Sequence, residues 1–206
     1  MRRRVTTGWG LGAWFLTAVL GACFIASLLA RHRAGATYFG LFGLLALLVC
    51  VLRRDGGPLL RGPPRALLVL GIFVNGMGWG GGLMDRIAFY DQGAHLLTTA
   101  GLVAVLPALM PRTREVLRDH PAILTLLLVG VGALTGICWE VYEFLVDRFL
   151  SPPPSMDISD TIADLVADVL GAFAGALLAA KTARATSPPA GSTRRWWRAP
   201  AGGSRA

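Results

Sequence analysis

The chain has 206 residues, of which 54% are hydrophobic and only 16% are charged. Its mean hydropathy is +0.57, and apolar runs long enough to cross a bilayer as a helix recur along it. These features exclude a water-soluble domain. The net charge of +8 does not indicate a nucleic-acid partner, because the arginines stand in short linkers between apolar runs.

We predict an all-α polytopic membrane bundle over residues 1–181, followed by a basic disordered tail over residues 182–206 that is rich in Pro, Gly, Ser and Arg. Gly and Pro in the linkers separate the apolar runs. The six expected transmembrane helices, each within a few residues, are Trp9 to Ala30, Ala36 to Leu52, Ala66 to Met84, Tyr90 to Leu109, Ala122 to Val146, and Ile158 to Ala180.

The distribution of Lys and Arg predicts the orientation of these helices. With six spans and a cytoplasmic N-terminus, sixteen of the twenty basic residues fall on the cytoplasmic side and four outside. If one span were lost, the linkers after it would change sides, and half of this asymmetry in Lys and Arg would be inverted. We therefore expect a multi-pass protein of the cell membrane with both termini cytoplasmic.

Acidic side chains lie on one face of each of the last three predicted helices. In the fourth, Asp91 and His95 are four residues apart, and Thr98 and Thr99 continue roughly the same face. In the fifth, Glu140 and Glu143 are three apart, and Asp147 follows four residues later. In the sixth, Asp160, Asp164 and Asp168 repeat every four residues, and Gly171 and Gly175 extend that stripe as a pair suited to close helix packing.

The predicted topology places all three acidic faces at the same, outer level. Nine of the twelve carboxylates of the chain gather at this end. Carboxylates inside a bilayer are costly, and so many could not stay ionised together without counter-charge. Bound cations, shared protons, or His95 and Arg86 could neutralise them.

Several carboxylates with one imidazole form a ligand set suited to a divalent cation. His95 and Asp91 are the candidate catalytic residues, with His95 as ligand or general base and Asp91 orienting it. The candidate metal ligands are Glu140, Glu143, Asp160, Asp164 and Asp168. A non-functional alternative remains open, in which Asp91, Asp157 and Asp160 cap helices and the other groups form an internal hydrogen-bond network.

The order of these motifs resembles a known family. Tyr90-Asp91-x-x-x-His95, then Trp139-Glu140-x-x-Glu143-Phe144, then the Asp160 to Gly175 stripe is similar to the YjdF-type bacterial inner-membrane proteins. The chain is similar, more distantly, to the VanZ-like family. The first resemblance implies an integral membrane protein of unknown function. The second implies a cell-envelope role that includes tolerance of glycopeptide antibiotics.

Three functions remain open from the sequence. The first is an envelope membrane protein whose outward-facing site binds a divalent cation and an anionic lipid or cell-wall precursor, and which is either an enzyme or a binding protein. The second is an ion- or proton-coupled transporter, for which Asn75 and the run from Gly76 to Gly82 are the only candidate for a broken helix. The third is a non-catalytic partner subunit of another membrane protein.

Overall fold

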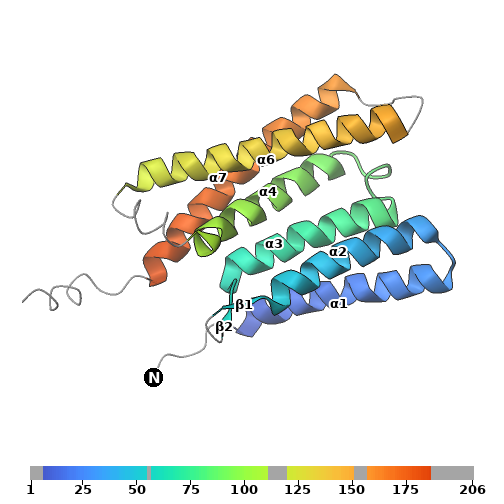
Figure 1. Cartoon of the computed structure of the whole chain (residues 1–206), viewed down its shortest axis with the longest axis horizontal. Coiled ribbons are helices and arrows are strands. Elements are labelled where there is room, and N and C mark those ends of the chain that lie inside the picture. The colour runs from blue at the N-terminus through green and yellow to red at the C-terminus, as the bar shows by residue number, and fades with distance from the viewer. Residues whose placement is uncertain (1–6, 55–56, 111–119, 151–156, 187–206) are drawn as a thin grey trace, which may run out of the picture.

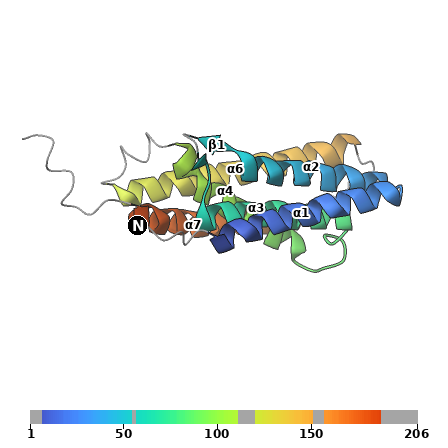
Figure 2. The same ribbon diagram turned by 90° about the horizontal axis from the view of Figure 1, so that it is seen from below.

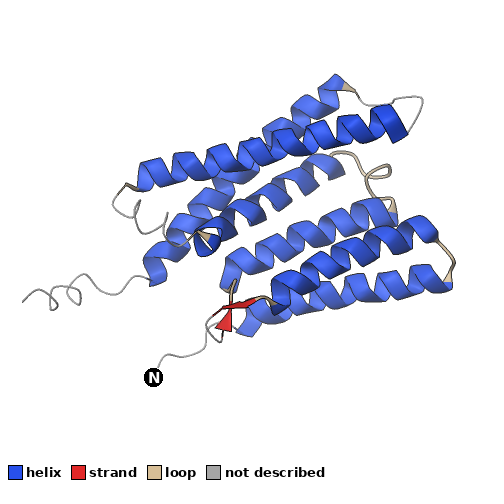
Figure 3. Ribbon diagram, in the orientation of Figure 1, coloured by secondary structure: helices blue, strands red, loops and turns tan. Residues whose placement is uncertain are grey.

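The computed structural model describes residues 7–54, 57–110, 120–150 and 157–186, and it is built almost entirely from helices (Figures 1 and 3). Two strands of two residues each, β1 (Arg53–Arg54) and β2 (Gly57–Pro58), pair antiparallel after the second helix. The helices are α1 (Thr7–Leu29), α2 (Arg33–Val51), α3 (Gly62–Asn75), the π-helix η1 (Gly76–Gly80), α4 (Tyr90–Leu109), α6 (Pro121–Leu150) and α7 (Ile158–Thr186).

The helices confirm the predicted membrane bundle. Five of them, α1, α2, α4, α6 and α7, are long and apolar enough to cross a membrane. The third predicted span, Ala66 to Met84, is divided between α3 and η1, so the count of six spans stays a prediction at this segment. Helix α7 extends to Thr186, which brings the first residues of the predicted tail into a helix. Residues 187–206 of that tail lie outside the described part of the chain.

Helix α3 continues without a break into the π-helix η1, in a glycine-rich stretch. Asn75 ends α3, and its side-chain amide donates to the carbonyl of Gly71 at 3.1 Å and to the hydroxyl of Thr98 at 2.7 Å. The hydroxyl of Tyr90 donates to the carbonyl of Val74 at 2.8 Å. A π-helical turn widens the backbone and leaves carbonyl groups without their usual helical partners. Hydrogen bonds between α3 and α4, one donated from each side, therefore hold the end of α3 in place.

The apolar core has two centres, one in each half of the bundle. Leu20 of α1, Phe39 and Phe42 of α2, and Val69 of α3 belong to the first. The second joins α4, α6 and α7 and consists of Val103, Leu106, Leu128, Ala172, Ala176 and Ala179. Figures 1 and 2 show the helices of both halves running roughly along one direction, with α3 against α4 between the halves.

Close backbone contacts at glycines fix α4 between α3 and α7. A Cβ atom at Gly71 of α3 would lie 2.7 Å from the Cα of Thr98, and one at Gly101 of α4 would lie 2.5 Å from the Cα of Leu68. On the other side, a Cβ at Gly171 of α7 would collide with the carbonyl group of Leu96. No larger residue can occupy these positions unless the helices move apart.

Gly175 of α7 repeats this contact one turn further along, because a Cβ there would collide with the carbonyl oxygen of Ala100 in α4. Glycines four residues apart on α7 thus lie directly against α4. The predicted role of the Gly171 and Gly175 pair in close helix packing is confirmed.

The turns at the acidic end position α4 and α7. Phe89, just before α4, adopts a left-handed conformation with φ of 60°, which redirects the chain into the helix. Asp157, just before α7, accepts hydrogen bonds from the backbone N–H and the hydroxyl of Ser159 at 3.1 and 2.7 Å. These bonds lower the pKa of Asp157. Asp157 therefore stabilises the start of α7, which is the capping role that the sequence left open as an alternative.

Enlarging Gly171 tests the contact between α4 and α7. We expect Gly171→Ala to lower the free energy of unfolding by about 1–3 kcal/mol, because the new methyl group meets the backbone of Leu96. The matched control is Gly130→Ala in α6, where a Cβ meets no atom within 4 Å. Thermal unfolding of the detergent-purified protein measures both. Equal melting temperatures for the two variants would contradict the packing described above.

Candidate functional site

The acidic ends of α4, α6 and α7 meet at the same end of the bundle (Figure 1). Helix α4 begins there at Tyr90, α6 reaches it with Leu150, and α7 begins there at Ile158. Because α4 packs against both α6 and α7, the three acidic faces can converge. The sequence could place the three faces at one level but could not show that they turn toward one another.

His95 lies at the centre of the converging side chains and is 7% exposed. Its Nδ1 atom is 3.1 Å from Oδ2 of Asp168, and the hydroxyl of Thr99 donates to the other oxygen of Asp168 at 2.5 Å. Asp168 is 2% exposed. Because a carboxylate accepts hydrogen bonds, this arrangement favours the tautomer with the proton on Nδ1 and a lone pair on Nε2.

The Nε2 atom of His95 faces two carboxylates across a gap. Oδ1 of Asp91 and Oε1 of Glu140 each lie 3.8 Å from it, which is too long for a hydrogen bond. Among the described residues, Oδ1 of Asp91 and both oxygens of Glu140 are buried without a hydrogen bond of good geometry, and the hydroxyl of Thr161 on α7 approaches Glu140. Glu140 is only 5% exposed. Such a carboxylate is costly unless an ion, a proton or water satisfies it.

A glutamine arranges the two acidic residues at the start of α7. The side-chain amide of Gln92 donates to Oδ1 of Asp160 at 3.1 Å and to Oδ1 of Asp164 at 2.9 Å. Asp164 is almost completely buried, whereas Asp160 is exposed. Gln92 therefore turns Asp164 toward the interior and holds Asp160 at the edge of the cluster.

Two groups of three side chains have the spacing needed to hold a metal ion. They are Asp91, His95 and Asp164, and His95, Glu140 and Glu143, and within each group the ligand atoms lie within 4.8 Å of one another. His95 belongs to both groups. Asp168 belongs to neither, because it lies against the opposite nitrogen of His95, and Asp160 is likewise outside them.

The structure thus brings together six of the seven residues that the sequence singled out. These are Asp91, His95, Glu140, Glu143, Asp164 and Asp168. The seventh, Asp160, joins only through Gln92. Sequence reasoning named Thr99 merely as part of the His95 face and did not consider Gln92. The position of Gln92, three residues before His95 on the same helix, was the available signal.

Gly136 of α6 leaves space for the acidic cluster. A Cβ atom at Gly136 of α6 would lie 2.7 Å from Cγ of Asp168. Gly136 therefore lets α6 pass directly over the Asp168 carboxylate, and one turn further along α6 brings Glu140 to the other side of His95. Gly136 has no side chain, so it contributes to the polar site by leaving room for the Asp168 carboxylate.

Comparison with protein families identifies the chain. Residues 12–185 match the family described as "Predicted membrane protein (DUF2238)", which is the YjdF type, and the chain belongs to this family. The YjdF-type resemblance is therefore confirmed, and the more distant relation to VanZ-like proteins stays a prediction. No curated protein and no solved structure matches the chain significantly.

Removing the hydroxyl of Thr99 tests the contact with Asp168. We expect Thr99→Val to lower the free energy of unfolding by about 1–3 kcal/mol, because Asp168 stays buried and loses a hydrogen bond. Thr135→Val is the control, since Thr135 is exposed and donates only to the carbonyl of Val131 in its own helix. Chemical or thermal unfolding in detergent compares the two. A Thr99 variant no less stable than the Thr135 variant would exclude this contact.

Proposed function

We propose that this member of the family binds a divalent cation between α4, α6 and α7, at the gap between His95 Nε2 and Glu140. The carboxylate of Glu140 carries the proposal, because it is almost fully buried, faces an imidazole nitrogen and makes no hydrogen bond of good geometry among the described residues, although the hydroxyl of Thr161 approaches it. A cation in the gap would satisfy Glu140 and Asp91 together and would offset several neighbouring negative charges.

The contacts of His95 support a ligand role for its Nε2 atom. A histidine that binds a metal usually donates its other ring N–H to a carboxylate, which fixes the ring and raises the basicity of the ligand nitrogen. Asp168 occupies that position, and Thr99 fixes Asp168. We therefore assign Asp168 to the orientation of His95 rather than to direct ligation, and Asp91 to ligation rather than to orientation.

The spacing of the ligand atoms fits a small divalent cation. Two ligands of a tetrahedral zinc ion lie about 3.3 Å apart, given metal–ligand bonds of about 2.0–2.1 Å. The distances of 3.8 Å from His95 Nε2 to Asp91 and to Glu140 are close to this value and need only a small contraction. A mixed set of imidazole and carboxylate ligands favours zinc, manganese or iron over calcium.

The bound cation would give the protein a positive centre at one membrane surface. Such an ion can hold the oxygen of an anion or activate a bound water molecule. With the predicted topology the protein is a multi-pass protein of the cell membrane whose termini are cytoplasmic and whose site faces outward. The site then lies where cell-envelope lipids and wall precursors are accessible.

Measuring metal content tests the proposal directly. We expect the detergent-purified protein to retain about one equivalent of zinc, manganese or iron, or to melt at a higher temperature when one of them is added. Glu140→Gln should weaken binding at least tenfold, because it removes the charge of one ligand. Asp85→Asn is the control, since Asp85 is an exposed carboxylate at the same end of the bundle.

Two outcomes would contradict the cation site. In the first, no divalent cation is bound and none changes the melting temperature. In the second, Glu140→Gln and Asp85→Asn bind the cation equally well. If the wild type is metal-free and Glu140→Gln is more stable than it, we would infer that the carboxylates share protons. That result favours proton-coupled transport or a purely structural network.

A further inference from the structure

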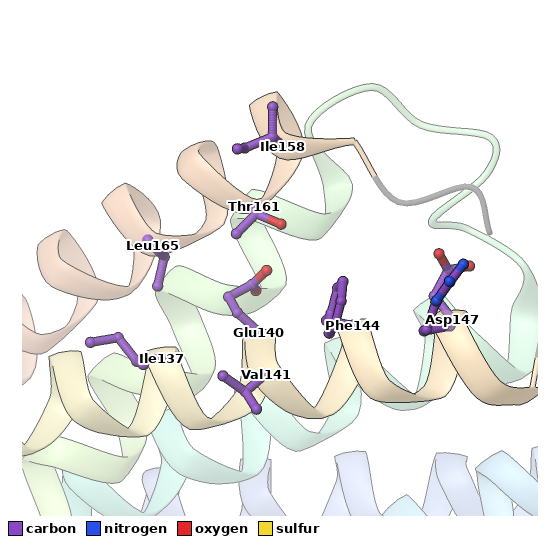
Figure 4. Close-up of a pocket in the computed structure, with 9 residues that line it drawn as sticks. Ile137, Glu140, Val141, Phe144, Asp147, Ile158, Thr161 and Leu165 are labelled. Atoms are coloured by element: carbon purple, nitrogen blue, oxygen red, sulfur yellow. The ribbon is translucent and has the colours of Figure 1, made fainter.

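A cleft of about 460 Å³ lies between α6 and α7, directly beside the proposed cation site. Figure 4 shows Glu140 pointing into it from α6, toward Thr161 of α7. The other lining residues are Ile137, Val141, Phe144, Asp147, Arg148, Ile158 and Leu165. Its volume falls within the range of small-molecule sites, about 300–1,000 Å³. Glu140 is thus shared between the acidic cluster and the cleft.

The cleft changes in polarity along its length. Figure 4 shows Ile137 and Leu165 at one end of the cleft and Asp147 at the other, toward the C-terminal end of α6, where Arg148 follows Asp147 in the chain. Ten residues of helix separate Ile137 from Asp147, which corresponds to about 15 Å. Only about one helical turn, from Glu140 to Ile137, lies on the apolar side of Glu140, so the cleft has room for a headgroup and the first part of an acyl chain.

Neighbouring aromatic residues indicate where the cleft meets the membrane surface. Trp139 and Tyr142 of α6 are exposed, and their ring centroids lie 5.4 Å apart. Exposed Trp and Tyr on a transmembrane helix are typical of the headgroup region. Glu140, which stands between them in sequence, then lies at headgroup level, with Ile137 on the acyl-chain side.

Exposed apolar side chains open the cleft toward the bilayer. Val141 and Phe144 of α6 are 52% and 55% exposed, and Ile158 of α7 is 76% exposed. In a membrane these surfaces face lipid. A lipid could therefore enter sideways between the helices without leaving its leaflet.

We propose that the cleft binds a phosphate-bearing membrane lipid, with its phosphate at the cation beside Glu140, Arg148 further out at the rim, and one chain against Ile137, Val141 and Leu165. This inference rests on the proposed cation site. Without a cation, Glu140 and Asp147 give the cleft two acidic side chains against one arginine, which opposes an anion. Binding of the phosphate group should therefore require the divalent cation, and the cation supplies the charge complementarity.

Binding of dioleoyl phosphatidic acid to the full-length protein in neutral detergent micelles tests this inference. We expect binding that depends on the added divalent cation and is at least tenfold stronger than that of dioleoylglycerol, which has the same chains without phosphate. Val141→Trp should fill the cleft and weaken phosphatidic acid binding at least tenfold. Arg148→Gln should weaken it less, because Arg148 is exposed and lies at the rim.

The matched control is Leu145→Trp. Leu145 belongs to the same helix, is 46% exposed and does not line the cleft, so this variant should bind phosphatidic acid like the wild type. Both tryptophan variants should keep their cation binding, because neither changes a ligand. Both positions face outward, so a folding defect is not expected, and a monodisperse elution profile checks it.

The outcomes separate this inference from the cation site itself. If the protein binds the cation but phosphatidic acid binds equally to Val141→Trp and Leu145→Trp, the lipid proposal is overturned and the cation site stands. Equal binding of dioleoylglycerol would also overturn it and show an unselective lipid contact. Competition by glycerol 3-phosphate as strong as that of phosphatidic acid would assign the site to a soluble phosphate. Absence of any cation binding would overturn both proposals.

Discussion

Helix α4 touches the backbones of two neighbouring helices at once, and only glycine permits both contacts. Gly71 and Gly101 bring α3 against one side of α4, and Gly171 and Gly175 bring α7 against the other. In lipid, helix association gains little from the hydrophobic effect and depends on such close packing. The same contacts set the depth and rotation of α7 relative to α4, which is what places Asp168 beside His95.

Because these helices approach so closely, little space remains for water between them. His95, Glu140, Asp164 and Asp168 are all at least nine-tenths buried. One imidazole cannot offset the charges of these carboxylates if all are ionised, and burial strengthens their mutual repulsion. The first half of the bundle has a core of apolar residues drawn from α1, α2 and α3. That half also contains one buried cation, Arg65 of α3, whereas the buried carboxylates are concentrated between α4, α6 and α7.

Much of this arrangement could be predicted from spacing alone. Residues three or four apart share a helix face, so the sequence identified the His95 face and the Asp164 and Asp168 face correctly. Topology then placed both faces at one end of the bundle. The glycine stripe on α7 indicated close packing, and the structure shows α4 as the helix that it meets.

Other features could not be predicted, because they depend on how each helix is rotated against its neighbours. Spacing could not distinguish Asp168, which contacts Nδ1 of His95, from Asp91, which faces Nε2. It also could not show that Gln92 reaches across to α7, since its position three residues before His95 gives its face on α4 but not its partner. The change from α3 to a π-helix within the third predicted span likewise occurs where α3 and α4 exchange hydrogen bonds, which spacing could not show.

The cleft beside Glu140 connects the buried charge to the bilayer. Helix α6 packs chiefly against α7 and less against α4, and Glu140 is the residue of the acidic cluster that also lines the cleft. A cation at Glu140 would offset the buried carboxylates on one side and attract an anionic headgroup on the other. Without the cation, the same cleft would be apolar with an acidic inner wall, and it would repel the headgroup that the ion attracts. One bound ion would thus account both for the stability of so many buried carboxylates and for the position of the cleft next to them.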